Sequence, residues 1–432
     1  MPFVVPVAVS DPAESMHTHD ACRIAITGIG LCTPFGPDRE TTWQGMLAGK
    51  SVTRWLSAPH WPDGSRMGGA PVCFPTVRPF RHPEPLIELA LTTASESLAD
   101  AGLTPQFLSQ QEIGVVFGTS KGGLHTFARM WENSQSESLE TTSDSLPQDS
   151  NEWLDVLPNR AASTISQMVG GYGPVLCPVM ACATGLAACL RGAELIANGD
   201  CDIVLVGSAD ASLQPAILGS FRRLGVLSRE TEDPSSACRP YDLRRSGFVV
   251  GEGAACLVLE RLELANQRGA NWYAEWCGGQ VLSDANGLTQ LEPTGASLQR
   301  LLRDLRSKLN ALPDYINLHG TGTTMNDVVE CRAIREVFGA DSQRLQCSSL
   351  KGGMGHLLGA AGSVELAATA LALRDQIVPP TINLGQSDPE CCLKLNPGEA
   401  RRMEINHAWK VSMGFGGHLA GACLRRRMPD RC

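Results

Sequence analysis

The most informative stretch of the chain is GPVLCPVMACATGL at residues 173–186, where an apolar run leads through a cysteine into a helical pattern. The run Val175–Met180 predicts a strand, and Gly185–Asn198 predicts an apolar helix. Cys182 lies between them among small residues, which leave its sulfur accessible. A thiol at a helix N-terminus faces unpaired N–H groups and the positive end of the helix dipole, so we expect a lowered pKa. Cys182 is therefore a candidate nucleophile, although most free cysteines are simply small buried apolar residues.

Short β-branched runs alternate along the chain with longer alanine- and leucine-rich stretches, which predicts an α/β fold. Further strands are predicted at Ile24–Ile26, Val115–Phe117, Ile203–Val206, Ala255–Leu259, Ile316–Leu318 and Val411–Met413. Further helices are predicted at Pro85–Ala101, Leu298–Leu309 and Leu358–Arg374. The last of these is nearly free of polar residues, so we expect it to be buried on most sides.

The chain is expected to consist of two halves that arose by a distant internal duplication. Both halves contain a strand, a tight small-residue turn and an apolar helix in this order. The charged segment Arg261–Asn271 precedes a second series of strands, which places an N-terminal half at residues 23–265 and a C-terminal half at 266–428. Residues 1–22 are interpreted as a flexible extension, and the polar segment Ser134–Asn151 as a mobile surface loop.

Composition excludes several classes of protein. The 432 residues are 43% hydrophobic, enough for a large core, and the net charge of -9 disfavours a general nucleic-acid binder. No run approaches eighteen apolar residues, and Phe3–Val9 is too short and lacks the charged start of a signal peptide, so we expect a soluble protein without membrane insertion. The sixteen cysteines show no zinc-type or secreted disulfide spacing, which favours a reducing cytoplasm.

Two histidines occupy turns like the one that carries Cys182. Tyr315–Leu318 predicts a strand that ends in His319, on the glycine- and threonine-rich turn HGTGTT. His356 lies in LKGGMGHLLGAAG, residues 350–362, again between a predicted strand and an apolar helix. Either histidine alone would most simply satisfy a local hydrogen bond. Together with an accessible cysteine, the pair predicts a catalytic site.

The same residues could instead belong to a nucleotide-binding site or a metal site. Lys351 precedes Gly352 and Gly353, and no Gly-Lys-Ser or Gly-Lys-Thr follows, so the phosphate-binding P-loop pattern is absent. A cysteine and two histidines could hold zinc, but the chain offers no clear fourth ligand. We therefore expect neither nucleotide nor metal at this site.

The sequence around these residues resembles that of the beta-ketoacyl-acyl-carrier-protein synthases, which are the elongating condensing enzymes of fatty acid and polyketide synthesis. The resemblance runs through RIAITGIG (23–30), ACATG (181–185), RPYD (239–242), GFVVGEG (247–253), HGTGT (319–323), GHLLGAAG (355–362) and GFGG (414–417). It implies the thiolase-like fold, in which two duplicated βαβαβαββ-type halves form a five-layer αβαβα sandwich. It also implies that Cys182 accepts the acyl chain, while His319 and His356 stabilise the enolate formed when a malonyl thioester loses CO2.

The same resemblance implies supporting residues and partners. The backbone N–H groups of Cys182 and Phe415 would form the oxyanion hole, and Phe415 would also gate the site. Lys351 and Glu330 would support the histidines, although Glu330 alone could be an ordinary helix-surface carboxylate, and Thr321 and Thr323 would bind the pantetheine arm. No metal or organic cofactor would be needed beyond the phosphopantetheine of the acyl carrier protein substrate.

Departures from the family pattern leave the substrate and the role open. Leu419 stands where an asparagine usually follows the glycine-rich gate, and Lys121 stands where an apolar residue near the acyl pocket is usual. The resemblance implies a homodimer, possibly a heterodimer with a related subunit, and an acidic carrier protein that Arg222 and Arg223 could contact. Two alternatives stay open: a catalytically silent chain-length partner subunit, and a thiolase-like enzyme that acts on coenzyme A esters.

Overall fold

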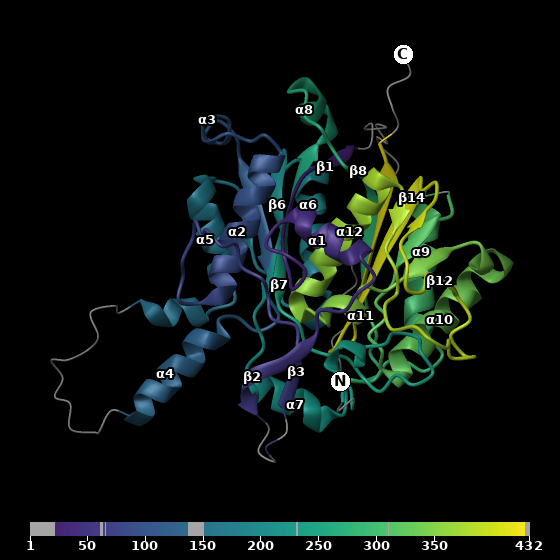
Figure 1. Cartoon of the computed structure of the whole chain (residues 1–432). Helices are drawn as coiled ribbons and strands as arrows, with labels where there is room; N and C mark the ends of the chain where they lie inside the picture. Colours follow the sequence, from purple (N-terminus) through teal and green to yellow (C-terminus); the bar gives the residue numbers. More distant parts are fainter. Residues whose placement is uncertain are drawn as a thin grey trace, which may run out of the picture.

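The structure is a computed structural model that describes residues 22–60, 64, 66–136, 151–229, 232–309 and 311–427. Its main feature is an 11-stranded sheet with the strand order β12-β10-β9-β14-β15-β8-β1-β7-β6-β4-β5 (Figure 1). The strands of this sheet are β1 (Ile24–Cys32), β4 (Ile113–Gly118), β5 (Val175–Leu176), β6 (Ile203–Asp210), β7 (Gly253–Arg261), β8 (Ala274–Ser283), β9 (Tyr315–Asn317), β10 (Gln346–Ser348), β12 (Lys394–Leu395), β14 (His407–Gly414) and β15 (His418–Arg426).

The sheet consists of two half-sheets with the same pattern of strand directions. In the N-terminal half, β1, β7 and β6 pair antiparallel, and β4 and β5 continue parallel to β6. In the C-terminal half, β8, β15 and β14 pair antiparallel, and β9 and β10 continue parallel to β14. The half-sheets join where Ile24–Ile26 of β1 pair with Ala274–Trp276 of β8. This repetition is what the predicted duplication requires, and the predicted thiolase-like α/β architecture is confirmed.

Helices cover both half-sheets and fill the space between them. The longest helices are α2 (Pro85–Asp100), α4 (Leu124–Ser136), α5 (Arg160–Val169), α6 (Thr184–Ala197), α7 (Pro215–Leu224), α9 (Ala296–Leu309), α10 (Thr324–Phe338) and α12 (Ala361–Asp375). Helices α2 and α5 pack outside the N-terminal half-sheet, and α9 and α10 pack outside the C-terminal one (Figure 1). Helices α6 and α12 lie between the half-sheets, which makes the five layers αβαβα.

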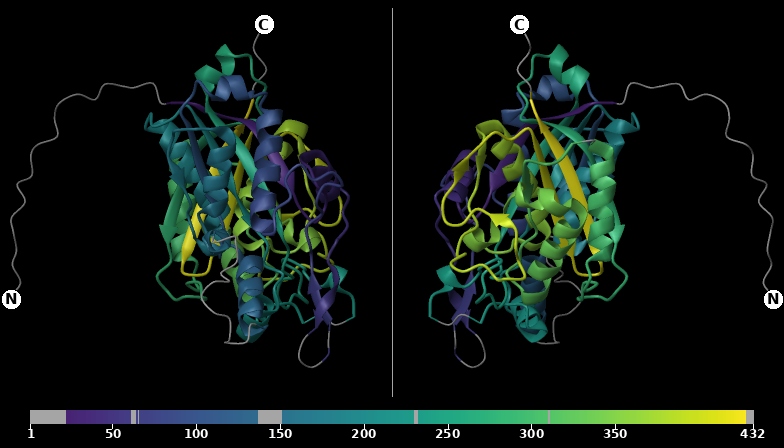
Figure 2. Two further views of the ribbon diagram at one scale, coloured as in Figure 1. Left: turned by 90° about the vertical axis from the view of Figure 1, so that its left-hand side faces the viewer. Right: turned by 90° about the vertical axis from the view of Figure 1, so that its right-hand side faces the viewer.

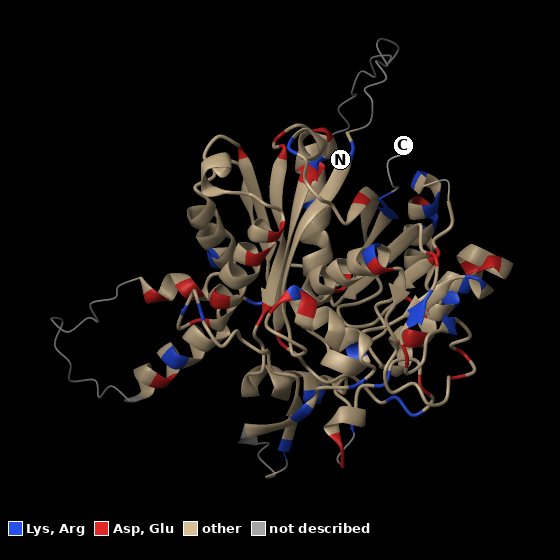
Figure 3. Ribbon diagram, turned by 45° about the horizontal axis from the view of Figure 1, so that its top comes forward, with Lys and Arg blue, Asp and Glu red and all other residues tan. Residues whose placement is uncertain are grey.

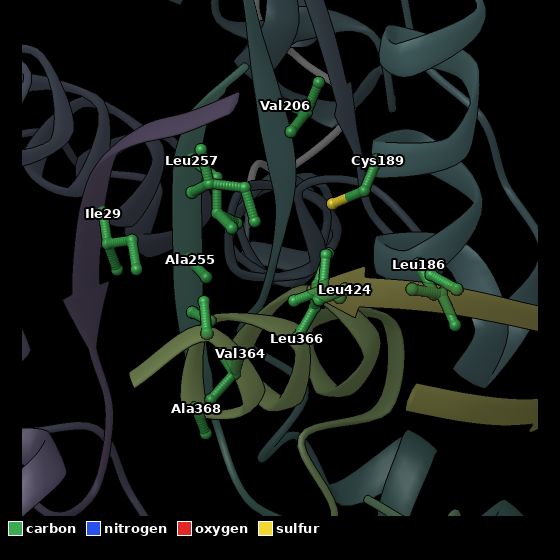
Figure 4. Close-up of a cluster of buried hydrophobic side chains, with 14 of the residues drawn as sticks. Ile29, Leu186, Cys189, Val206, Ala255, Leu257, Val364, Leu366, Ala368 and Leu424 are labelled. Carbon is green, nitrogen blue, oxygen red and sulfur yellow. The ribbon is translucent and has the colours of Figure 1, made fainter. Parts of the chain in front are cut away.

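The central layer is the most deeply buried part of the molecule. Every residue of α12 from Ala361 to Leu373 is buried, as its apolar sequence predicts. Figure 4 shows α6 and α12 contributing Leu186, Cys189, Val364 and other side chains to a cluster with residues of the adjoining strands. The two helices approach closely, because a Cβ on Gly185 would lie 2.5 Å from the Ser363 nitrogen. A Cβ on Gly362 would likewise lie 2.5 Å from the Leu186 nitrogen, so only glycine fits at either position.

Several details differ from the sequence-based expectations. The strand predicted at Val175–Met180 ends at Leu176. Pro178, two residues later, has no N–H group with which to continue the ladder of hydrogen bonds. The predicted helix Leu358–Arg374 begins with a 3-10 turn and becomes α-helical at Ala361. Ser134–Ser136 belong to α4 rather than to a loop, while residues 137–150 of that predicted segment lie outside the described residues. Residues 1–21 of the predicted extension also lie outside them.

The short helix α8 (Leu262–Gln267) spans the predicted junction between the halves. Positive and negative residues are interspersed over the outer helices and loops, whereas the central strands carry few of either (Figure 3). Within the described ranges, no helix has both the length and the apolar composition that a bilayer span requires.

Candidate active site

Cys182, His319, His356 and Phe415 line one cavity of about 210 Å³. Each follows a strand of the large sheet: Cys182 comes shortly after β5, His319 after β9, His356 after β10 and the short helix α11 (Lys351–Met354), and Phe415 directly after β14. The carboxyl ends of these strands therefore deliver residues from both halves to one place. The hairpin of β2 (Arg54–His60) and β3 (Arg66–Gly69) lies at the same end of the molecule as α7 (Figure 2).

The turn that carries Cys182 is strained and tightly held. Ala181 has a φ of 47°, in the left-handed region that residues with a side chain rarely adopt. The Thr184 hydroxyl accepts a hydrogen bond from the Met180 nitrogen at 2.8 Å and donates one to the Ala181 carbonyl at 2.8 Å. A Cβ on Gly414 would lie 2.6 Å from the Met180 carbonyl oxygen and 3.1 Å from the Cys182 nitrogen. The glycine thus allows the end of β14, with Phe415, to lie against the nucleophile turn.

The pKa of Cys182 differs from the sequence-based expectation. Burial is the largest influence and raises the pKa of the thiol to about 11, while the positive charges of Lys121 and Lys351 act in the opposite direction. The N-terminus of α6 also favours the thiolate, but its effect falls off within one turn. The expected lowered pKa is therefore corrected: at neutral pH the resting side chain is a thiol.

We expect the alkylation of Cys182 by iodoacetamide to speed up by about tenfold per pH unit between roughly pH 7 and 10, because only the thiolate reacts. The rate is expected to rise with pH because the pKa of the thiol is about 11, so the thiolate fraction keeps increasing throughout this range. The rate would be followed by intact mass, with the Cys182→Ala protein reporting alkylation at other cysteines. A plateau below pH 8 would mean that the helix N-terminus outweighs burial.

Both histidines are buried and neutral. Burial is the largest cause that lowers the pKa of His319 and His356 well below 6.5, and the nearby charge of Lys351 acts in the same direction. The two rings lie with centroids 5.5 Å apart at 81°, and Phe248 packs edge-on against His356 at 5.1 Å. The Leu358 nitrogen donates to His356 Nδ1 at 3.2 Å, which places the proton of the neutral ring on Nε2. His356 can therefore donate a hydrogen bond without being charged.

Glu330 holds the turn that presents His319. Its carboxylate accepts hydrogen bonds from the His319 nitrogen at 2.7 Å, the Gly320 nitrogen at 2.9 Å and the Tyr241 hydroxyl at 2.7 Å. The side chain is fully buried, so it is not the helix-surface carboxylate that remained an alternative. Burial raises the pKa of Glu330 and the three donors oppose this.

A buried ion network lies behind the same turn. Lys351 Nζ donates to the His319 carbonyl at 2.5 Å and to Glu365 Oε1 at 2.6 Å, and Glu365 Oε2 lies 2.7 Å from Lys410 Nζ. All three side chains are completely shielded from solvent. Lys351 was expected to support the histidines, but Glu365 and Lys410 were missed. Their signal in the sequence is that Glu365 is the single charged residue of the buried stretch Ala361–Leu373, and that Lys410 interrupts the buried strand β14.

The remaining expected residues divide between the cavity and the core. Thr321 and Thr323 line the cavity, with their hydroxyl oxygens 2.9 Å apart. Leu419 is buried in the apolar cluster of the C-terminal half and is absent from the cavity lining formed by the described residues. Its departure from the family pattern therefore concerns packing, whereas Lys121 lies beside the site.

A nucleophile on a strand-to-helix turn and two histidine turns, joined across a duplicated sheet, define a condensing enzyme of the thiolase-like class. The family models for the N-terminal and C-terminal domains of beta-ketoacyl synthase match residues 76–265 and 273–385. The chain belongs to this family and is an enzyme of the acyltransferase class.

Relatives from two kinds of biosynthesis are similar over most of the chain. The tetracenomycin polyketide synthase ketoacyl synthase alpha subunit of Streptomyces glaucescens is 35% identical, over 96% of this chain and 100% of the relative. The 3-oxoacyl-[acyl-carrier-protein] synthase 2 of Coxiella burnetii is 34% identical, over 94% and 98%. A solved type II polyketide ketosynthase, in complex with its acyl-carrier protein and bound to the hexaketide, superimposes with a TM-score of 0.85 at 30% identity, covering 94% of this chain and 100% of that one.

Proposed function

We propose that this chain is a ketosynthase that condenses an acyl group on Cys182 with a malonyl unit delivered by an acyl carrier protein. The observation that carries the proposal is the convergence of Cys182 and two neutral imidazoles on one cavity. A neutral imidazole suits the reaction because it can donate a hydrogen bond to a developing enolate oxygen without the high desolvation cost of a buried charge.

The reaction proceeds in two stages. Cys182 sulfur attacks the carbonyl carbon of the acyl thioester, the bond to the carrier sulfur breaks, and the thiol proton ends on that leaving sulfur. The malonyl thioester then loses CO2, and the electron pair of the broken carbon–carbon bond forms an enolate that accepts hydrogen bonds from His319 and His356. The enolate carbon attacks the acyl carbonyl on Cys182. The Cys182 thiolate leaves and takes up one proton from solvent, and the product is a 3-oxoacyl thioester two carbons longer.

The supporting roles follow from position. The backbone N–H groups of Cys182 and Phe415 stabilise the tetrahedral oxyanion, supported by the close approach of β14 to the nucleophile turn at Gly414. Thr321 and Thr323 bind the pantetheine arm from the cavity wall. The chemistry needs no metal or organic cofactor of the protein, since the histidines supply the stabilising donors. Fifteen described cysteines are free thiols, in keeping with a cytoplasmic setting.

The carrier protein docks on the last turn of α7. Arg222 and Arg223 are exposed there, and their neighbours Phe221 and Gly225 line the cavity, so a carrier held by the arginines is close to the site. Carrier proteins of this kind are acidic, and steering by opposite charge raises the association rate. Replacing both arginines with alanine is expected to weaken carrier binding in a titration, and more so at low salt. Unchanged binding would remove this surface from consideration.

The protein associates as a homodimer through the edge strand β5, or pairs there with a related subunit. Strand β5 ends the sheet order, and Tyr172 beside it is 93% exposed. Helix α4 projects from this side of the N-terminal half (Figure 1) and exposes Phe127 and Trp131, one turn apart. A large exposed apolar surface of this kind is typical of an interface.

The Phe127→Asp/Trp131→Asp protein is expected to be a monomer by light scattering, whereas the natural protein has about twice the 46.1 kDa mass of one chain. Val77→Asp serves as the control, because Val77 is 82% exposed and the change introduces the same carboxylate. A dimer that survives the double substitution would place the interface elsewhere.

A test of the function uses acyl-carrier-protein thioesters of several chain lengths, followed by malonyl carrier protein. We expect an acyl adduct by intact mass that is absent from the Cys182→Ala protein, and its discharge as a product two carbons longer. No adduct with any donor would overturn the proposal and favour a silent partner subunit or an enzyme that acts on coenzyme A esters.

A further inference from the structure

A polar cluster centred on Lys121 lies beside the nucleophile and has no role in the chemistry described above. Lys121 Nζ donates to Ser120 Oγ at 2.6 Å and to Ser212 Oγ at 3.3 Å, and it lies 3.9 Å from Asp210 Oδ2. Asp210 is 1% exposed and accepts hydrogen bonds from both serine hydroxyls. The cluster therefore fixes one cation at the carboxyl ends of β4 and β6.

The cluster is attached to the catalytic turns. Asp210 Oδ2 accepts a hydrogen bond from the Gly359 nitrogen at 3.1 Å, three residues after His356. A Cβ on Gly359 would lie 2.6 Å from the Ser120 nitrogen, so the two turns pack without a gap. Lys121 is thus held in place by the same segment that positions His356.

The ammonium group lies beside the wall of the cavity that contains Cys182. Its nitrogen is 5.8 Å from the centroid of Phe221, a residue of the cavity lining, and Phe221 packs edge-on against Phe248. Lys121 is the first of the charges that influence the pKa of Cys182, and it lowers the pKa of that thiol. The cation therefore lies behind the Phe221 wall of the cavity that contains Cys182.

The hydrogen bonding of Lys121 leaves one donor for a ligand. An ammonium group has three N–H donors, and within the described part of the chain two of them reach acceptors, because Asp210 is too distant for a hydrogen bond. A saturated acyl chain that passes this N–H donor displaces the water bound to it and offers no hydrogen-bond acceptor in exchange. Such desolvation is unfavourable for a charged group. A carbonyl or hydroxyl oxygen on the chain replaces that water with a charge-assisted hydrogen bond.

We propose that Lys121 is a specificity-determining residue that favours acyl groups carrying a carbonyl or hydroxyl oxygen on the chain over saturated acyl groups of equal length. The inference rests on the proposed function, because it concerns the acyl group that Cys182 carries. The expected substrates are therefore partly oxidised acyl chains, such as those formed by condensation when the resulting 3-oxo groups are not fully reduced.

The test compares octanoyl and 5-oxooctanoyl N-acetylcysteamine thioesters, which are matched in length and differ in one oxygen. The rate of Cys182 acylation is measured by intact mass for each donor. In the Lys121→Met protein we expect the ratio of the oxo to the saturated rate to fall by about tenfold, the effect of losing one hydrogen bond to a charged group. Lys121→Arg, which keeps the cation, should retain most of the preference. Lys50→Met, at an exposed lysine, should leave the ratio unchanged.

The outcomes separate this inference from the proposed function. If both donors slow equally in Lys121→Met, the lysine acts on the thiol or on the turn, and the inference is wrong while the function stands. If the natural protein acylates Cys182 equally fast with both donors, the inference is again wrong. If neither these donors nor carrier-bound acyl groups form an adduct, the proposed function fails and the inference fails with it.

Discussion

Replacing Glu365 with glutamine is expected to lower the free energy of unfolding by about 3–5 kcal/mol, the usual effect of removing one partner from a buried ion pair. Glu365 contacts Lys351 Nζ at 2.6 Å and Lys410 Nζ at 2.7 Å, and no side chain of the three is exposed. Without the carboxylate, the two buried ammonium groups lose the partner that contacts both of them. The loss would be measured by urea unfolding at pH 7, with Glu390→Gln at an exposed position as the matched control.

The pH dependence provides a second check on this network. Burial is the main cause that lowers the pKa of Lys410 to about 8, from 10.5. Between these values the unfolded chain binds more protons than the folded one, so stability contributed by this lysine rises with pH. Glu365 opposes the effect of burial on Lys410, so its loss lowers the pKa of Lys410 further, and we expect the deficit in unfolding free energy of Glu365→Gln to shrink between pH 7 and 9. A deficit that stays constant over this range would show that lost packing, rather than unpaired charge, destabilises the variant.

The second large effect concerns the histidines. His319→Ala and His356→Ala are each expected to slow the release of CO2 from malonyl carrier protein by about 10²–10³-fold, the usual effect of removing one oxyanion donor. Acylation of Cys182 should change far less, because the first stage uses backbone donors. The measurement compares CO2 release with adduct formation in the same preparations.

His82→Ala is the matched control, since His82 lies outside the residues that line the cavity. Because burial keeps the pKa of His319 and His356 well below 6.5, the natural protein should show no loss of CO2 release as the pH falls from 8 to 6.5. If acylation and decarboxylation slow equally in either alanine variant, that histidine instead acts on Cys182.

The nucleophile and histidine turns could be predicted because their signals are local. Cys182 and His319 each follow an apolar run and precede alanine or glycine, and His356 lies between Gly355 and the apolar residues Leu357 and Leu358. None of these patterns needs knowledge of distant contacts. The boundaries of α2, α6 and α9 also agree with the prediction to within two residues.

Features that depend on distant pairing were missed. Strand β8 contains Gly278 and Gly279, which weaken its strand pattern, and it is stabilised by long pairing with β15. Helix α10 buries Asp327 and Glu330 on the face that meets Tyr241, so its polarity conceals its burial. The pairing of Glu365 with Lys351 and Lys410 joins three separate elements, and nothing in the spacing of these residues indicates it.

The close contact of α6 and α12 at Gly185 and Gly362 has a consequence for how such an enzyme can diversify. Helix α6 begins just after Cys182 and α12 begins shortly after His356, so this contact sets the spacing between the two residues to which the proposed function assigns the covalent and the decarboxylating stages. A side chain at either glycine would widen that spacing. Phe221 in the cavity wall belongs to α7, and Lys121 beside the site follows β4, so neither residue is part of this contact. Substitutions there can alter which substrate is accepted while the reaction itself stays intact, which makes substrate range and catalytic competence separable under selection.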